Sequence, residues 1–214
     1  MSISDAHILL LPVRSVYGIL AYVSCPFILR RYQKDCALNA LTVPPVQENQ
    51  ACYGSGNENH KHDKIVLEDL DLIGKPCDKT TAWAEHFARQ IHGDDSQARQ
   101  DMQVRFLILP DNVFSFLAET ATDIRTRIRI KPDTGVVDGG ALWSEENLPA
   151  ETLLWGVFTI ANSRDPDNSQ CSEALNSLIP DRQLLSMGGN VGIGNGLVIF
   201  FKAAEEHGTQ ENGS

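Results

Sequence analysis

The stretch MGGNVGIGNGLVIFF, from Met187 to Phe201, decides whether the fold contains a nucleotide-binding loop or a glycine-rich turn between strands. Five glycines fall within nine residues, and an apolar run follows directly. A dinucleotide-binding loop requires G-x-G-x-x-G at the start of a helix, but Leu197 stands where the third glycine would fall and LVIFF favours a strand. A phosphate-binding P-loop requires a lysine after its last glycine, whereas Asn195 and Gly196 follow Gly194. The stretch therefore predicts a glycine-rich turn between two strands.

Such a turn has two interpretations. Glycines without side chains let another backbone come close, and their amides can face an anion. The alternative is a flexible hairpin or bulge with no ligand, and the spacing alone leaves both open.

A second pattern lies upstream in DIRTRIRIK, residues 123–131. Alternation with a period of two predicts a strand with four cations on one face, which are Arg125, Arg127, Arg129 and Lys131. Alternate residues on a strand are about 6.6 Å apart, a spacing commensurate with the phosphates of an extended single-stranded nucleic acid. The alternative is an exposed strand face paired with neighbouring carboxylates. The charge pattern leaves both hypotheses open.

Other elements follow from the same kinds of signal. HILLLPVRS, residues 7–15, predicts a buried strand, and SVYGILAY, residues 15–22, predicts a short helix. A second helix is expected with Ser24 as its cap and Pro26 in its first turn. The remaining predicted elements are a strand at 103–111 ending at Pro110, a helix capped by Asp111, a hairpin at 123–149 around the turn KPDTG, a strand at 151–160, a loop at 162–170 and a short helix at 172–179.

The segment from about residue 44 to 101 is rich in Asn, Gln, Gly, Asp and His. This composition predicts a loop-dominated insertion that contains one helix, residues 78–91, capped by Thr80 or Thr81. The polar end, residues 204–214, is expected to be disordered. We therefore expect a single domain over residues 1–203.

Composition limits the class of protein. The formal net charge is −10, so the surface as a whole repels polyanions, and any nucleic-acid site is local. Five scattered cysteines without a CxxC pair are typical of reduced thiols in a cytoplasmic protein. The most apolar window, residues 16–29, is interrupted by Gly18 and Pro26 and falls short of a membrane span. We expect a cytoplasmic protein with no membrane partner.

Catalytic and metal-binding motifs are weak. Cys52, His60, His62 and Cys77 are zinc-ligand types at a non-standard spacing, and incidental residues of a polar loop are the favoured interpretation. No G-x-S-x-G or HExxH occurs. The sequence chemistry alone indicates no catalysis, and we expect no catalytic residue, no metal site and no cofactor.

Three ordered blocks of the sequence resemble one family. They are SDAHILLLPVRSVYGILAYVSCPFILRRY, residues 4–32; RIRIKPDTGVVDGGALWSEENLPAETLLWGVF, residues 127–158; and GGNVGIGNGLV, residues 188–198. The blocks resemble the backbone subunit of type III-B (Cmr) CRISPR effector complexes, a member of the RAMP superfamily. The resemblance implies an α+β, modified ferredoxin-like fold akin to an RNA recognition motif, and subunits that stack into a filament along a guide RNA.

The resemblance also implies a set of RNA-binding residues. The glycine-rich loop is the RNA-contacting signature of the superfamily, and the PVRS and GALWSEE segments lie near the RNA path in relatives. Together with the cationic strand, the expected RNA-binding residues are Arg14, Ser15, Arg125, Arg127, Arg129, Trp143, Glu145, Gly188, Gly189, Asn190, Gly192, Gly194, Asn195 and Gly196.

Two departures from the family pattern matter. Relatives carry Arg or Lys where this sequence has Asn195, and often Thr where it has Gly192, so one charge-assisted phosphate contact is lost. The family also begins with a strand, a loop and a helix ahead of the segment where this chain starts, and that loop carries the aspartate required for metal-dependent RNA cleavage. Without the first strand, we expect an incomplete sheet that needs a partner, supplied by another polypeptide, a swapped copy or a neighbouring subunit.

Three functional hypotheses remain. The leading one is a guide-RNA-binding scaffold subunit of a type III CRISPR interference complex in antiviral defence, with guide RNA, target RNA, other Cmr-type subunits or further copies as partners. The second is half of a split endoribonuclease that uses a divalent metal, and whether the chain is an enzyme is open. The third is an interaction module that has lost RNA binding.

Overall fold

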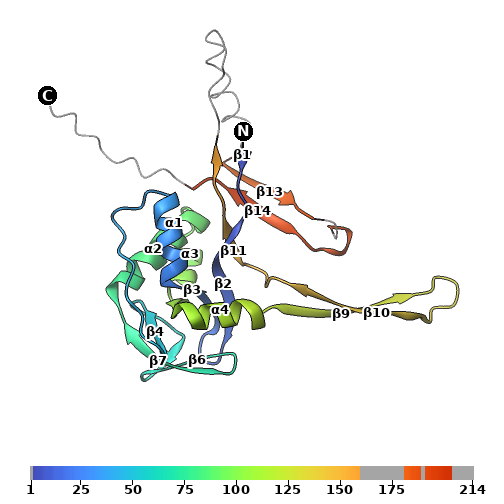
Figure 1. Cartoon of the computed structure of the whole chain (residues 1–214), viewed down its shortest axis with the longest axis horizontal. Coiled ribbons are helices and arrows are strands. Elements are labelled where there is room, and N and C mark those ends of the chain that lie inside the picture. The colour runs from blue at the N-terminus through green and yellow to red at the C-terminus, as the bar shows by residue number, and fades with distance from the viewer. Residues whose placement is uncertain (1, 160–180, 189–190, 204–214) are drawn as a thin grey trace, which may run out of the picture. The chain divides into compact units, whose positions relative to one another are not determined.

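The computed structural model describes residues 2–159, 181–188 and 191–203 (Figure 1). The chain forms two compact units. One unit is His7–Trp155, and the other combines Met1–Ala6 with Gly156–Ser214. The predicted loop at 162–170, the short helix at 172–179 and the tail at 204–214 lie outside the described residues. The single domain expected over residues 1–203 stays a prediction.

The unit His7–Trp155 is built on a mixed eight-stranded sheet in the order β11-β2-β3-β8-β4-β7-β6-β5. The sheet closes on itself, because Ser15 at the end of β2 also pairs with Leu67 of β6. Its strands are β2 (His7–Ser15), β3 (Ile19–Ser24), β4 (Gln50–Tyr53), β5 (His60–Lys61), β6 (Lys64–Leu67), β7 (Leu70–Pro76), β8 (Phe106–Ile108) and β11 (Leu153–Trp155). With four described helices, the predicted α+β class is confirmed.

The core of this unit lies on both faces of the sheet. Strand β8 shows the alternation, because Phe106 and Ile108 pack in one cluster and Leu107 packs in the other. Helices α1 (Pro26–Asp35) and α2 (Asp78–His92) cover the first cluster, where Trp83 and Phe87 are almost completely buried. Helix α4 (Asp111–Thr120) covers the second cluster. Burial of each large side chain stabilises this unit by roughly 1.5–3 kcal/mol.

The predicted strand at 7–15 is confirmed, but the predicted helix at 15–22 is wrong. Strand β3 occupies the second half of that segment, after a turn, and pairs antiparallel with β2, from Leu11 opposite Val23 to Ser15 opposite Ile19. On its other edge β3 pairs in parallel with β8. Pairing on both edges satisfies the backbone groups of the segment, and these contacts with distant residues outweigh its local helical pattern.

Helices α1, α2 and α4 are confirmed, whereas their predicted caps are wrong. Cys25 is the N-cap of α1, and Ser24 is the last residue of β3. Cys77 is the N-cap of α2, so neither Thr80 nor Thr81 caps it. Pro110 precedes α4, and the carboxylate of Asp111 accepts a hydrogen bond from the backbone N–H of Phe27 at 2.9 Å instead.

The segment 44–101 is not loop-dominated. It contains β4 to β7, α2 and most of α3 (Ser96–Gln103). Several of its apolar residues are buried in the core, where Ala51, Ile65 and Leu67 of the sheet are completely inaccessible to solvent. The polar composition belongs to exposed faces and turns, which explains why the prediction from composition was wrong.

A long hairpin, β9 (Asp123–Ile130) and β10 (Val137–Asn147), follows α4 and extends away from the sheet of its unit (Figure 1). The strands pair antiparallel from Asp123 opposite Asn147, and the register shifts between Val137 and Leu142. The turn closes with a hydrogen bond from the N–H of Lys131 to the carbonyl of Val136 at 2.9 Å. The predicted hairpin around KPDTG is confirmed.

The second unit contains two short antiparallel sheets. Strand β1 (Ser2–Ile3) pairs with β12 (Phe158–Thr159), and β13 (Arg182–Ser186) pairs with β14 (Leu197–Phe201). The predicted strand at 151–160 is interrupted between Trp155 and Phe158, so it becomes β11 and β12. The predicted strand, glycine-rich turn and strand at the C-terminal side are confirmed.

Candidate nucleic-acid interface

The PVRS segment ends β2 and presents one cation to solvent. The side chain of Arg14 is 83% exposed, and its Nε lies 3.9 Å from Oε1 of Glu68. The backbone N–H of Arg14 donates to the same carboxylate at 3.3 Å. Ser15 is buried instead, and its Oγ accepts a hydrogen bond from the N–H of Gly18 at 3.4 Å. Arg14 is therefore available to a ligand, whereas Ser15 shapes the turn that follows.

A shallow pocket joins Arg14 to the base of the hairpin. Arg14 and Glu68 line it together with Thr122 and Asp123, where β9 begins. The remaining lining residues are Pro12, Leu20, Thr120, Ala121, Pro149 and Ala150. The fold thus brings the PVRS segment and the root of the cationic strand together, although more than 100 residues separate them in the sequence. Neither Glu68 nor the pocket has a signal in the local sequence.

Two of the cations on β9 pair with carboxylates. Nη2 of Arg125 lies 3.5 Å from Oδ2 of Asp123, in a pair whose side chains are 52% and 40% exposed. Nε of Arg127 lies 2.5 Å from Oε2 of Glu145, in a pair whose side chains are only 25% and 19% exposed. An exposed ion pair contributes roughly 0–1 kcal/mol, so an RNA phosphate can compete for Arg125. The Arg127 pair is better protected from solvent.

Glu145 also binds the indole of Trp143. Oε1 of Glu145 accepts a hydrogen bond from Nε1 of Trp143 at 3.0 Å, while Oε2 accepts from Arg127. Trp143 and Arg127 are directly opposite each other in the hairpin, so the three side chains share one face. The indole remains 41% exposed, which leaves part of the ring open to stacking on a base.

Arg129 lies further along the same face and is exposed. It makes no ion pair with any residue that the structure describes, in contrast to Arg125 and Arg127. The cationic face thus combines carboxylate-paired cations with an exposed one. Arg125 and Arg127 fit the hypothesis of pairing with neighbouring carboxylates, whereas the exposed Arg129 fits the hypothesis of phosphate binding. RNA binding by the three arginines stays a prediction.

The opposite face of the hairpin is apolar and exposed. Ile124 is 71% exposed and Leu142 is 66% exposed. Ile128, Ile130 and Val137 extend the same face, with about half of each side chain exposed. The alternation on β9 therefore separates charge from apolar surface, as the sequence pattern predicts.

The glycine-rich turn between β13 and β14 uses the conformational freedom of its glycines. Gly188, Gly194 and Gly196 have φ angles of 91°, 83° and 71°. A Cβ on Gly196 would collide with the carbonyl oxygen of Met187, whereas a Cβ on Gly192 would meet nothing within 4 Å. Asn195 is half-buried. Gly189 and Asn190 lie outside the described residues, and the RNA-binding role of the turn stays a prediction.

The Cys and His residues considered as zinc ligands in the 44–101 segment contact aromatic, backbone and apolar groups of the fold. The ring of His60 stacks on Tyr53 with centroids 4.1 Å apart, and Nδ1 of His60 lies 3.1 Å from the carbonyl oxygen of His62. Cys52 is buried, and the pKa of its thiol is raised to about 11, mainly by this burial and to a smaller extent by the neighbouring Cys77. Within the described ranges, no three His, Cys, Asp or Glu side chains are grouped so as to hold a metal ion.

No helix in the described part of the chain is long and apolar enough to cross a membrane.

Comparison with known proteins defines the class. The family model of the RAMP superfamily matches residues 2–199, and the chain belongs to this superfamily. The CRISPR system Cmr endoribonuclease Cmr4 of Pyrococcus furiosus is 32% identical over 204 residues, which cover 92% of this chain and 67% of the relative.

Solved structures agree with this assignment. The crystal structure of oligomeric Cmr4 from Pyrococcus furiosus is similar with a TM-score of 0.67 and 27% identity, covering 92% of this chain and 70% of that one. A chain in the cryo-EM structure of the type III-B Cmr-beta bound to cognate target RNA has a TM-score of 0.64. That chain is 18% identical, covers 92% of this chain with 68% of its own length, and supports the fold alone.

Proposed function

We propose that this chain is a guide-RNA-binding backbone subunit of a type III CRISPR effector complex. The observation that carries the proposal is the 32% identity to the Cmr endoribonuclease Cmr4, which extends over 92% of the chain. The match to the RAMP superfamily over residues 2–199 includes the PVRS segment, the hairpin and the glycine-rich turn together.

The surface chemistry supports RNA as the ligand. Arg14 is largely exposed at a pocket shared with the start of β9, and the cations of β9 lie on one face. Because the whole chain has a net charge of −10, such local groups of cations are where a polyanion can bind. Target RNA and other Cmr-type subunits or further copies are the expected partners in the complex.

A filter-binding titration with a guide RNA, at about 50 and about 200 mM salt, tests the proposal. We expect saturable binding that weakens steeply with salt, because Lys and Arg contacts to phosphates release counterions. Binding that is absent at the lower salt concentration would contradict the proposal and favour the interaction module. A duplex DNA of equal length is the control for attraction by charge alone.

A further inference from the structure

The turn after Arg14 holds an unfavourable backbone conformation. Ile19 has a φ angle of 67°, in the left-handed region, which is a marked outlier for a β-branched residue. Its side chain is 84% exposed, so burial does not compensate for the strain. A residue in such a conformation costs roughly 1–3 kcal/mol and persists only where its surroundings fix it.

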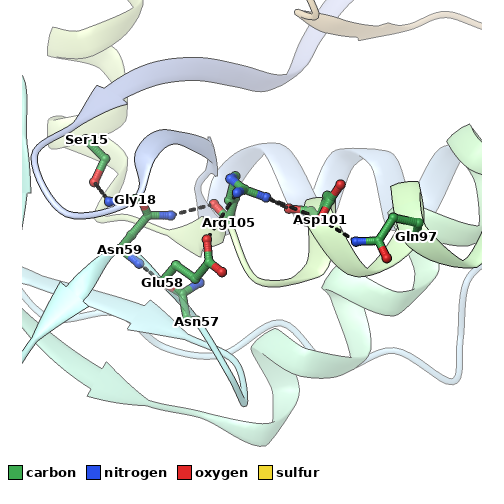
Figure 2. A network of polar contacts seen from close by, with 8 residues as sticks. All are labelled: Ser15, Gly18, Asn57, Glu58, Asn59, Gln97, Asp101 and Arg105. Carbon is green, nitrogen blue, oxygen red and sulfur yellow. Dashed lines mark hydrogen bonds and ion pairs between the residues drawn. The ribbon is translucent and has the colours of Figure 1, made fainter.

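The buried side chain of Asn59 packs against this turn at Gly18. A Cβ on Gly18 would collide with Oδ1 and Cγ of Asn59, so the turn lies directly on this side chain (Figure 2). Asn59 is completely buried, and Oδ1 has no hydrogen-bond partner among the described residues. A buried acceptor left without a partner costs roughly 1–3 kcal/mol. Two unfavourable features thus meet where the turn at residues 16–18 leads into β3.

Asn59 is itself held by a polar network that joins the loop before β5 to α3 and to Arg105, the residue that precedes β8 (Figure 2). Its Nδ2 donates to the carbonyl of Arg105 at 3.1 Å, and its backbone N–H donates to Oδ1 of Asn57 at 2.9 Å. Nη2 of Arg105 binds Oε2 of Glu58 at 3.1 Å, and Nη1 donates to the carbonyl of Asp101 at 2.6 Å. The side chain therefore cannot move away from Gly18 without loss of its hydrogen bond to the carbonyl of Arg105, and the backbone of Asn59 is held in place by Asn57.

We infer that Asn59 is a positioning residue for RNA binding, because it fixes the turn that follows Arg14 and thereby the direction in which Arg14 is presented. The inference rests on the proposed function. A cation in a strand that ends at a fixed turn loses less conformational freedom on binding than one beside a mobile loop, which favours affinity. The strain at Ile19 and the unpartnered amide oxygen are the stability cost of this fixed turn.

A double-mutant cycle tests the inference in a guide-RNA titration over a range of salt concentrations. Asn59→Ala is expected to weaken binding several-fold and to reduce the salt slope by about 0.7, the value of one phosphate contact on a single strand. Arg14→Ala should do the same, and the double variant should bind no more weakly than Arg14→Ala alone. Additive effects, or a folded Asn59→Ala variant that binds like the wild type, would overturn the inference.

Two further variants separate positioning from folding. Gly18→Ala keeps Asn59 and its hydrogen bonds but pushes the turn away, so it should reproduce the loss of binding and slope in a chain that still melts cooperatively. Thr80→Ala is the matched control, because Thr80 is also completely buried and its Oγ1 also lacks a partner among the described residues. It should leave RNA binding unchanged, and an equal loss there would refute the positioning role. If the wild type fails to bind RNA, the proposed function fails and this inference fails with it; wild-type binding with an unaffected Asn59→Ala variant rejects the inference alone.

Discussion

The cationic face of β9 leads to a quantitative prediction for the double substitution Arg125→Ala and Arg129→Ala. Arg129 has no ion pair to the described residues, and the Arg125 pair with Asp123 is long and exposed, so both cations are open to phosphates. Arg127 is held by Glu145, which Trp143 also binds, and we expect this pair to persist in the complex. Two lost contacts at about 0.7 each reduce the salt slope by about 1.4.

Fluorescence anisotropy of a labelled guide RNA measures this slope. Between about 50 and 200 mM salt, a slope difference of about 1.4 means that the wild type loses about sevenfold more affinity than the variant. Arg127→Ala alone is expected to change the slope much less. The control is Lys34→Ala with Lys79→Ala, which removes two exposed cations from α1 and α2. A wild-type slope in the double variant, or a full loss from Arg127→Ala alone, would refute the reasoning.

Two further predictions concern stability. Gly196→Ala forces a side chain into a φ of 71° against the carbonyl of Met187. It should therefore destabilise the β13–β14 hairpin by roughly 1–3 kcal/mol and accelerate hydrogen exchange of the Met187 amide. Gly192→Ala is the control, because a Cβ at Gly192 meets nothing within 4 Å, and it should have neither effect. Burial raises the pKa of Cys25 to about 12 from an ordinary value of 9.0, so the unfolded chain loses this proton first and the free energy of unfolding should fall as pH rises from about 9 towards 12. Urea titrations at about pH 8 and 10.5 measure the fall, which should be roughly 1–2 kcal/mol larger in the wild type than in a Cys25→Ala variant, and an equal fall in that variant would contradict the assignment to this thiol.

Local patterns predicted the parts of the fold in which neighbouring residues determine the structure. The alternation in β9, the turn KPDTG and the glycine-rich turn each carry their geometry within about ten residues. The helix predicted at 15–22 failed because its strand depends on pairing with Phe106 and its neighbours, which no local pattern shows. The segment 44–101 was misjudged because its overall composition is polar, while its minority of apolar residues, Ile65, Leu67 and Trp83 among them, is completely buried.

The candidate site was predictable only in its exposed parts. Arg14 and the β9 cations could be named from charge and spacing, but their partners could not. The register shift in β10 places Glu145 within reach of Arg127. The pairing of β6 with the end of β2 places Glu68 within reach of Arg14. Asn59 had no signal at all, because its role depends on a contact with Gly18 across the closed sheet.

The parallel pairing of β3 with β8 has a consequence for synthesis on the ribosome. Tyr22 must wait for Phe106, which is made 84 residues later, before this edge of β3 is paired. At roughly 5–20 residues per second, the wait lasts about 4–17 s. During that time β2 and β3 form an apolar hairpin without its central neighbour, which is the period in which the nascent chain is most open to aggregation and to capture by chaperones.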